Sequence, residues 1–110
     1  MNILNELNAT VLQRKGMEYN PEEKSYTAYL FSKGEDKILK KCGEECTEMI
    51  IAAKNDDNAE LANEVADLLY HILVLCAQKN MPLSDVENVL KSRHNKIGNL
   101  KAFKQVDKES

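Results

Sequence analysis

The segment from Val65 to Ala77 constrains the fold more than any other part of the sequence, because it is apolar on nearly every side. It lies in a predicted helix that follows a turn at Asn55–Asn58 and ends at about Lys79. A helix that is hydrophobic all round has to be buried on nearly all sides. Its longest apolar stretch, from Leu68, is interrupted by a histidine and is too short to cross a bilayer. The sequence therefore predicts a central helix packed within a bundle.

The rest of the chain favours helices over strands. Only 4 Gly and 2 Pro occur in 110 residues, and Ala, Leu, Glu and Lys are abundant. Apolar residues recur at helical spacing, and the intervening turns carry Gly, Pro or Asn. We expect helices over the following ranges: Ile3 to Lys15, Ser25 to Phe31 with a stop at Gly34, Glu35 to Lys54, a helix capped by Asn58 that runs to about Lys79, and a last helix that starts at Pro82 and Ser84. The predicted fold is an all-α bundle of about four to five helices.

Length and charge limit the organisation and the function classes. With no repeat or linker, we assign residues 1–98 to one domain and residues 99–110 to a polar tail that we expect to fray. The net charge of −3 argues against a nucleic-acid binder, which would need clustered basic residues. No secretory signal is recognised. The cysteines, Cys42, Cys46 and Cys76, lack paired spacing and indicate reduced thiols in a cytoplasmic protein.

Two pairs of carboxylates are the strongest chemical signal. Glu45 and Glu48 are spaced i, i+3 on one predicted helix, and Glu64 and Asp67 have the same spacing on the next. Residues so spaced project from one helix face. If the helices fold back around a turn centred on Asp56, Glu48 faces Glu64 and Glu45 faces Asp67. Four acidic side chains are thus predicted to converge on one patch.

Such a patch requires cations, because like charges repel and unpaired carboxylates in an apolar helix are costly. An all-oxygen cluster suits a hard divalent ion, Mg²⁺ or alternatively Mn²⁺. A di-iron bundle would want Glu-x-x-His motifs on two helices, and none occurs. A zinc site from the three cysteines and His71 would lack the usual Cys-x-x-Cys pair. Magnesium also leaves coordination positions for water and substrate phosphates, as phosphoryl chemistry uses it.

Lysines on the first of these helices offer a simpler interpretation, in which surface ion pairs satisfy the acids. This is ordinary helix decoration for Glu44, but it is less plausible for four acids, since surface pairs do little to offset burial. In the functional interpretation, Lys37 and Lys41 flank the metal and bind the outer phosphates. Arg93 and Lys96 are further candidates for which we prefer a solvated surface position. Three hydroxyl residues after a polar loop, Ser25, Tyr26 and Thr27, either contact a sugar or phosphate or cap the following helix.

These motifs resemble a known family. Lys41 to Glu48, with the sequence KCGEECTE, followed by Glu64-Val65-Ala66-Asp67, is similar to the EExxE…ExxD signature of the all-α MazG-like nucleotide pyrophosphohydrolases. Within that superfamily, the SYTAYLF segment at 25–31, the DKILKK segment at 36–41 and the ADLLYH segment at 66–71 resemble phosphoribosyl-ATP pyrophosphohydrolases of histidine biosynthesis. The resemblance covers about Leu4 to Arg93.

The resemblance implies Mg²⁺-dependent hydrolysis of phosphoribosyl-ATP to phosphoribosyl-AMP and pyrophosphate. It implies metal ligands at Glu45, Glu48, Glu64 and Asp67. Glu44 matches the first glutamate of the motif and would orient or deprotonate the water, so Glu44 and Glu45 are the expected catalytic pair.

Assembly and two rival functions remain as expectations. The apolar helix needs more cover than the short remaining helices provide, so we expect a homodimer with a shared bundle, as the resemblance also implies. A house-cleaning pyrophosphohydrolase of nucleoside triphosphates would use the same four acids. A non-catalytic helical dimerisation module is the alternative from another class.

Overall fold

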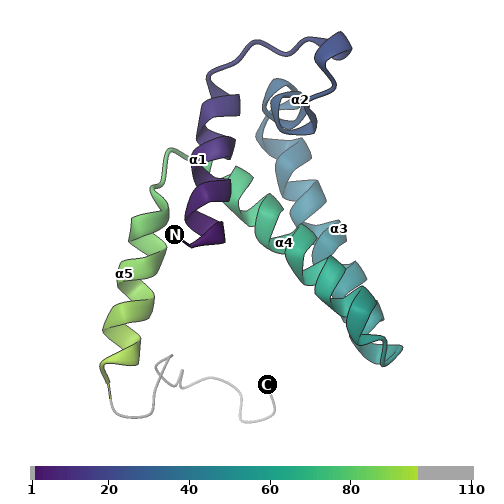
Figure 1. Ribbon diagram of the computed structural model, residues 1–110, viewed down its shortest axis with the longest axis vertical. Helices are drawn as coiled ribbons and strands as arrows, with labels where there is room; N and C mark the ends of the chain where they lie inside the picture. Colours follow the sequence, from purple (N-terminus) through teal and green to yellow (C-terminus); the bar gives the residue numbers. More distant parts are fainter. Residues whose placement is uncertain (1, 97–110) are drawn as a thin grey trace.

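The computed structural model describes residues 2–96, and this part of the chain is helical with no strand. The predicted all-α class is confirmed (Figure 1). The elements, in chain order, are α1 (Ile3–Lys15), the 3-10 helix η1 (Pro21–Glu23), α2 (Tyr26–Lys33), α3 (Glu35–Lys54), α4 (Asn58–Gln78) and α5 (Leu83–His94). The expected tail at 99–110 lies outside the described residues.

The short helix α2 begins at a side-chain cap. The Ser25 hydroxyl accepts a hydrogen bond from the Ala28 amide at 3.2 Å, and this satisfies a donor that the first turn leaves free. The helix continues to Lys33, two residues past the predicted end at Phe31, and stops at Gly34 as expected. Gly34 has φ of 94°, a conformation that glycine adopts readily and that lets α3 start in a new direction.

Helices α3 and α4 form an antiparallel hairpin, the dominant packing pair of the fold (Figure 1). The turn between them is centred on Asp56, which has φ of 55°. The predicted cap was wrong by one residue: Asp57 is the N-cap, and its Oδ1 accepts from the Glu60 amide at 3.1 Å, whereas Asn58 is the first helical residue. The aspartate was overlooked because either residue type can cap a helix.

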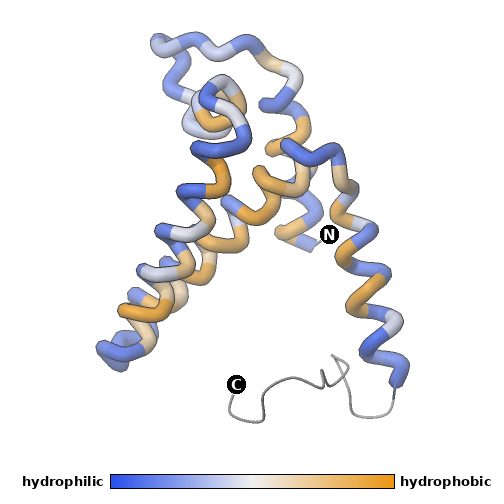
Figure 2. The backbone as a smooth tube through the Cα atoms, turned by 180° about the vertical axis from the view of Figure 1, so that it is seen from behind, coloured by the Kyte–Doolittle hydropathy of each residue, from blue (hydrophilic) through white to orange (hydrophobic). Residues whose placement is uncertain are grey.

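The hydrophobic core lies at one end of this hairpin, where α1 and α2 pack against it (Figures 1 and 2). Lys15, at the end of α1, donates from Nζ to the Ala77 carbonyl and to Asn80 Oδ1, both at 2.6 Å, and so closes the C-terminus of α4. The buried core consists of Val11, Leu30, Ile38, Val74 and Ala77.

Within a single chain α4 is not buried on nearly all sides, in line with the expectation that the short remaining helices give it too little cover. Leu69 and Ile72 remain 39% and 38% exposed, because only α1 and α3 pack closely on α4. Helix α5 packs only loosely on the other described helices, and apolar residues follow both α4 and α5 in Figure 2. Among the described residues, no helix is long and apolar enough to span a membrane.

Candidate functional site

Three of the four predicted metal ligands meet on the α3–α4 hairpin. One carboxylate oxygen from each of Glu45, Glu48 and Glu64 lies within 4.8 Å of the others. Glu48 and Glu64 interact across the hairpin, as the turn centred on Asp56 predicts. Helix geometry explains the group, because the i, i+3 spacing brings Glu45 and Glu48 to the same face of α3.

Two oxygen atoms of this group have no partner. Glu45 is buried, at 7% exposure, and its Oε2 accepts no hydrogen bond within the described part of the chain. The same holds for Oε2 of Glu64. Buried polar atoms are nearly always paired, so two unpaired carboxylate oxygens within this three-carboxylate group are suited to a cation ligand.

A lysine satisfies only part of this demand. Lys41 Nζ lies 3.5 Å from Glu45 Oε1 and 3.4 Å from Glu44 Oε2, and its side chain is 23% exposed. Burial alone would lower the pKa of Lys41, but Tyr26, Glu44 and Glu45 outweigh it and the pKa is raised. The ion-pair interpretation therefore accounts for Glu44 and for one oxygen of Glu45, and leaves the orphan oxygens unexplained.

The crowding of acids changes the protonation of Glu64. Hydrogen bonding to Glu60, then burial, then the neighbouring Glu48 raise the pKa of Glu64 to about 7. Two ionised carboxylates cannot hydrogen-bond to each other, so without a cation a proton has to sit between them. Either a proton or a divalent cation would relieve the repulsion among these carboxylates.

The remaining predicted acids and lysines lie around this group. Glu44 is exposed and pairs with Lys41 and with Lys40, the latter at 4.0 Å. These are the surface ion pairs along one helix that the simpler interpretation predicts. Asp67 is exposed and is not part of the three-carboxylate group; its backbone carbonyl lies 2.7 Å from His71 Nδ1. Lys37 is half-buried, and no ion pair of its side chain is found among residues 2–96.

The hydroxyl cluster that opens α2 joins this helix to α4. Tyr26 Oη lies 3.1 Å from His71 Nε2, and Thr27 Oγ1 is hydrogen-bonded to the hydroxyl of Tyr70. Ser25 serves as the cap of α2. Burial raises the pKa of Tyr26, against the opposing effect of Lys41, and Tyr70 and Glu45 raise it further. Lys41 and Glu45 therefore both act electrostatically on the Tyr26 hydroxyl.

A zinc site formed by the three cysteines and His71 would lack its histidine ligand. Both ring nitrogens of His71 are engaged, one by Tyr26 and one by the Asp67 carbonyl. The cysteines are free thiols, and in the described residues Cys42 Sγ donates to the His71 carbonyl at 3.5 Å. No group of three ligands in residues 2–96 contains a cysteine or histidine.

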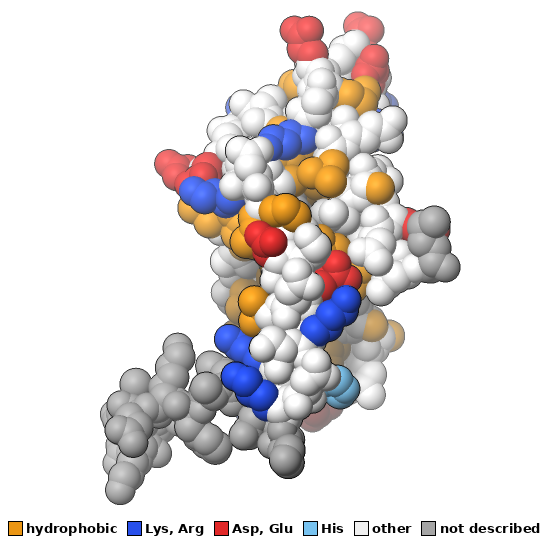
Figure 3. All heavy atoms as spheres, turned by 90° about the vertical axis from the view of Figure 1, so that its left-hand side faces the viewer, with side chains coloured by type: hydrophobic (Ala, Val, Ile, Leu, Met, Phe, Trp, Pro, Cys, Tyr) orange, Lys and Arg blue, Asp and Glu red, His pale blue; other side chains and the backbone are white. Residues whose placement is uncertain are grey.

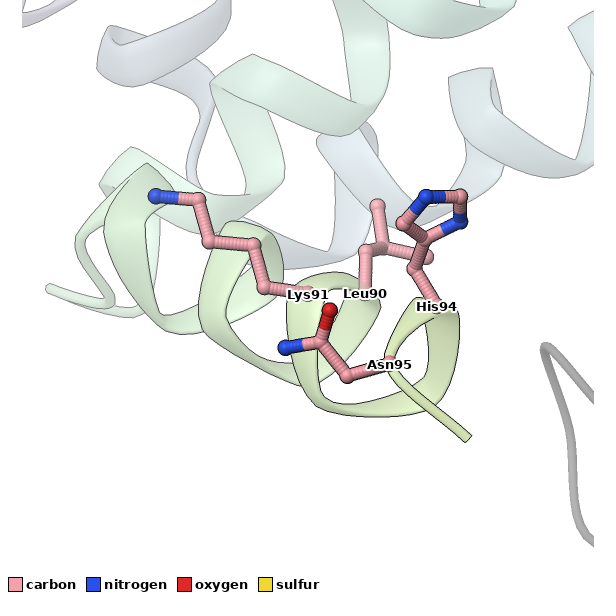
Figure 4. Close-up of a pocket in the computed structure, with 4 residues that line it drawn as sticks. All are labelled: Leu90, Lys91, His94 and Asn95. Carbon is pink, nitrogen blue, oxygen red and sulfur yellow. The ribbon is translucent and has the colours of Figure 1, made fainter. Parts of the chain in front are cut away.

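Helix α5 stands apart from this site. Arg93 is half-buried near its end, where Lys and Arg side chains gather on the face shown in Figure 3. A hollow of about 500 Å³ lies beside this end of the helix (Figure 4). Its described lining comes from the end of α5 and the residue that follows it, and contains none of the carboxylates: Leu90, Lys91, His94 and Asn95.

Sequence reasoning missed two features. Glu60 stands one turn before Glu64 on α4, at the i, i+4 spacing that could have indicated its contact with Glu64. Tyr19 and Tyr29 join Tyr26 in an aromatic cluster, with Tyr19 and Tyr29 ring centroids 5.7 Å apart. The i, i+3 spacing of Tyr26 and Tyr29 could have indicated that these two rings lie on one face of a helix. The position of Tyr19 depends on the loop before α2.

An all-oxygen donor set with two orphan oxygens fits Mg²⁺ or Mn²⁺. Glu45, Glu48 and Glu64 are the residues that would hold the ion. Lys41, which pairs with Glu44 and Glu45, provides a cation for an anionic ligand. Such an arrangement suits hydrolysis at a phosphate group.

Comparison with known proteins agrees with this chemistry. The family model described as phosphoribosyl-ATP pyrophosphohydrolase matches residues 4–94. The chain is 51% identical over 105 residues to phosphoribosyl-ATP pyrophosphatase of Bacillus mycoides, covering 96% of this chain and 95% of that protein. It is 53% identical over 105 residues to the enzyme of the same name from Listeria welshimeri, covering 96% and 98%. A Bacillus anthracis relative is 52% identical over 98 residues, 89% of each chain.

The family match spans nearly the whole described structure, including the hairpin that carries the carboxylates. This chain therefore belongs to the phosphoribosyl-ATP pyrophosphohydrolase family.

Proposed function

We propose that this protein hydrolyses phosphoribosyl-ATP to phosphoribosyl-AMP and pyrophosphate, the second step of histidine biosynthesis, with Mg²⁺ as its cofactor. The relatives named above carry this substrate in their names and cover almost all of the chain. The observation that carries the proposal is the pair of orphan oxygens, Glu45 Oε2 and Glu64 Oε2, in a three-carboxylate group.

Glu45, Glu48 and Glu64 would hold the ion, with Asp67 as the fourth ligand that the hairpin pattern predicts. A bound Mg²⁺ would neutralise charge on the leaving pyrophosphate. Asp67 is exposed on the same helix as Glu64, one turn further along, and its side chain would turn toward the group when the ion binds.

The protein's own groups position water and phosphates. Glu44 is exposed beside the group and would orient or deprotonate the attacking water. Lys41 bridges Glu44 and Glu45 and would turn its ammonium toward a substrate phosphate, with Lys37 one turn before it on α3 as a second cation. The Tyr26 hydroxyl borders the same surface, while Arg93 is the most remote of the proposed substrate contacts.

A substrate panel tests this function. Pyrophosphate release should be fastest with phosphoribosyl-ATP, should require Mg²⁺ and should be lost with EDTA. Faster release from dCTP or another nucleoside triphosphate would identify a house-cleaning enzyme instead. Absence of both hydrolysis and Mg²⁺ binding by calorimetry would favour a non-catalytic helical module.

We also infer a homodimer in the cytoplasm. Apolar side chains of α3 and α4 are exposed in the single chain, at an energetic cost that a second copy would remove. They include Ile50, Ile51, Leu69 and Ile72. The three free thiols suit a reducing compartment. Sedimentation at twice the chain mass of 12.5 kDa tests the assembly.

A further inference from the structure

An open pocket lined by aromatic rings lies where the loop after η1 meets α2. It has a volume of about 280 Å³, and its wall is formed by these residues: Tyr19, Pro21, Lys24, Ser25, Tyr26 and Tyr29. Three of the four tyrosines of the sequence line it, and the fourth, Tyr70, lies behind Tyr26 at a centroid distance of 6.2 Å. The wall of the pocket is therefore largely aromatic.

The rings are held in fixed positions. Tyr26 and Tyr29 stack with an interplanar angle of 24°, and Tyr19 meets Tyr29 edge-on at 66°. The Tyr26 hydroxyl is tied to His71 Nε2 across to α4. Tyr26 is nevertheless 44% exposed, so part of this aromatic surface faces solvent, where apolar surface is unfavourable.

Lysine side chains lie beside parts of this aromatic surface, while Glu18 and Glu23 line the neighbouring hollow on the Tyr19 side. Lys24 lines the pocket, and Lys33 Nζ lies 5.7 Å from the Tyr29 ring centroid. Lys41 acts electrostatically on the Tyr26 hydroxyl and pairs with Glu45 of the carboxylate group. A ligand that rests on the Tyr26 ring would therefore feel the charge of this lysine.

We propose that this tyrosine pocket binds the adenine ring of the substrate by stacking and so selects a purine nucleotide for the adjoining carboxylate site. The inference rests on the proposed function and adds Tyr19 and Tyr29 as specificity-determining residues. Stacking of one base on an aromatic side chain typically raises affinity by roughly fivefold or more. The contact tolerates substitution at the edges of the base because it uses the π-face.

The test uses the full chain and two matched variants at a loop position that does not belong to the core. Tyr19→Leu removes the ring, and Tyr19→Phe retains it. We expect Tyr19→Leu to raise KM for phosphoribosyl-ATP by roughly fivefold or more, with kcat within about twofold of the parent, while Tyr19→Phe behaves as the parent. Equal KM values for all three proteins would overturn the pocket assignment.

A binding measurement separates this inference from the proposed function. The chain has 4 Tyr and 0 Trp, so ring-labelled tyrosine NMR gives few signals and intrinsic fluorescence reports the tyrosines alone. Titration with AMP should shift the signals of Tyr19, Tyr26 and Tyr29, and ribose 5-phosphate, which lacks the base, should not. Tyrosine shifts on AMP addition without hydrolysis of phosphoribosyl-ATP would support the pocket and refute the proposed function. Hydrolysis of phosphoribosyl-ATP with no AMP-dependent shift would support the proposed function and refute the pocket.

Discussion

Tyr26 Oη and His71 Nε2 lie 3.1 Å apart and join α2 to α4 beside the carboxylate group. The Asp67 carbonyl can only accept, so His71 donates from Nδ1 at 2.7 Å, and Nε2 is the nitrogen that faces the Tyr26 hydroxyl. His71 is buried, and this hydroxyl is the partner of its second nitrogen.

Tyr26→Phe should therefore lower the free energy of unfolding by about 1–3 kcal/mol, because it leaves a buried nitrogen without a partner. Urea unfolding followed by circular dichroism measures the change. Tyr29→Phe, which also removes one hydroxyl and keeps the ring, is the control. An unfolding midpoint equal to that of the parent would mean that the bond contributes nothing.

Glu45→Gln should reduce turnover of phosphoribosyl-ATP by roughly 100-fold or more, because the amide removes the charge of a buried carboxylate that we assign to the metal. The helical circular dichroism should stay unchanged. Glu6→Gln, at an exposed site in the first turn of α1, should retain full activity. Normal turnover by the Glu45 variant would refute the assignment.

Magnesium binding should depend on pH through Glu64, whose pKa is raised to about 7. Below pH 7 a proton competes with the ion, so affinity should fall by roughly tenfold per pH unit and level off above pH 7. Isothermal titration between pH 5.5 and 8.5 measures this dependence. A constant affinity over that range would show that Glu64 takes no part in binding.

The same pKa predicts how the metal-free protein responds to pH. The folded state binds the Glu64 proton more tightly than the unfolded chain, whose glutamate has its ordinary pKa of 4.5. This contribution to stability is present at low pH and is lost as pH rises from about 4.5 to 7. We therefore compare the stability of the Glu64→Gln variant with that of the parent in EDTA. The variant should be more stable relative to the parent at pH 8 than it is at pH 5, and thermal unfolding measures both differences.

Leu69→Arg combined with Ile72→Arg should convert a homodimer to a monomer, because the charges would lie on the exposed apolar face of α4. Sedimentation velocity at a series of concentrations measures the assembly, and circular dichroism checks that the helices remain. A parent protein that sediments as a monomer at every concentration would contradict the inferred dimer.

Lys15→Met should destabilise the fold by about 1–3 kcal/mol, since Nζ donates to the Ala77 carbonyl and to Asn80 at the end of α4. Lys54→Met, at an exposed position, is the matched control. Thermal unfolding should separate the two variants, and both should retain activity well below their melting temperatures. Equal melting temperatures would show that this cap is dispensable.

The sequence predicted the hairpin well because its information is local. The polar turn is centred on Asp56, and the i, i+3 spacing of acids on either side sets which residues meet, so the facing of Glu48 and Glu64 followed from counting. Helix ends were harder, since Asp57 and Asn58 are both good caps and only the backbone decides between them.

The aromatic pocket could not be predicted in the same way. Tyr19 lies in an irregular loop with no repeating period, and its approach to Tyr29 depends on how η1 turns the chain. The tie between Tyr26 and His71 joins residues 45 positions apart, which no local pattern encodes. The apolar composition of α4 predicts that the helix is covered, but it does not say whether the same chain or a second copy covers it.

The three residues between α3 and α4, with Asp56 in a left-handed conformation, set the rotational phase of one helix relative to the other. One inserted residue would rotate the whole of α4 by about 100° about its axis and turn Glu64 away from Glu48. Many surface positions of the hairpin can change without altering that phase. A change in the length of this turn would abolish ion binding while every carboxylate is still present in the chain.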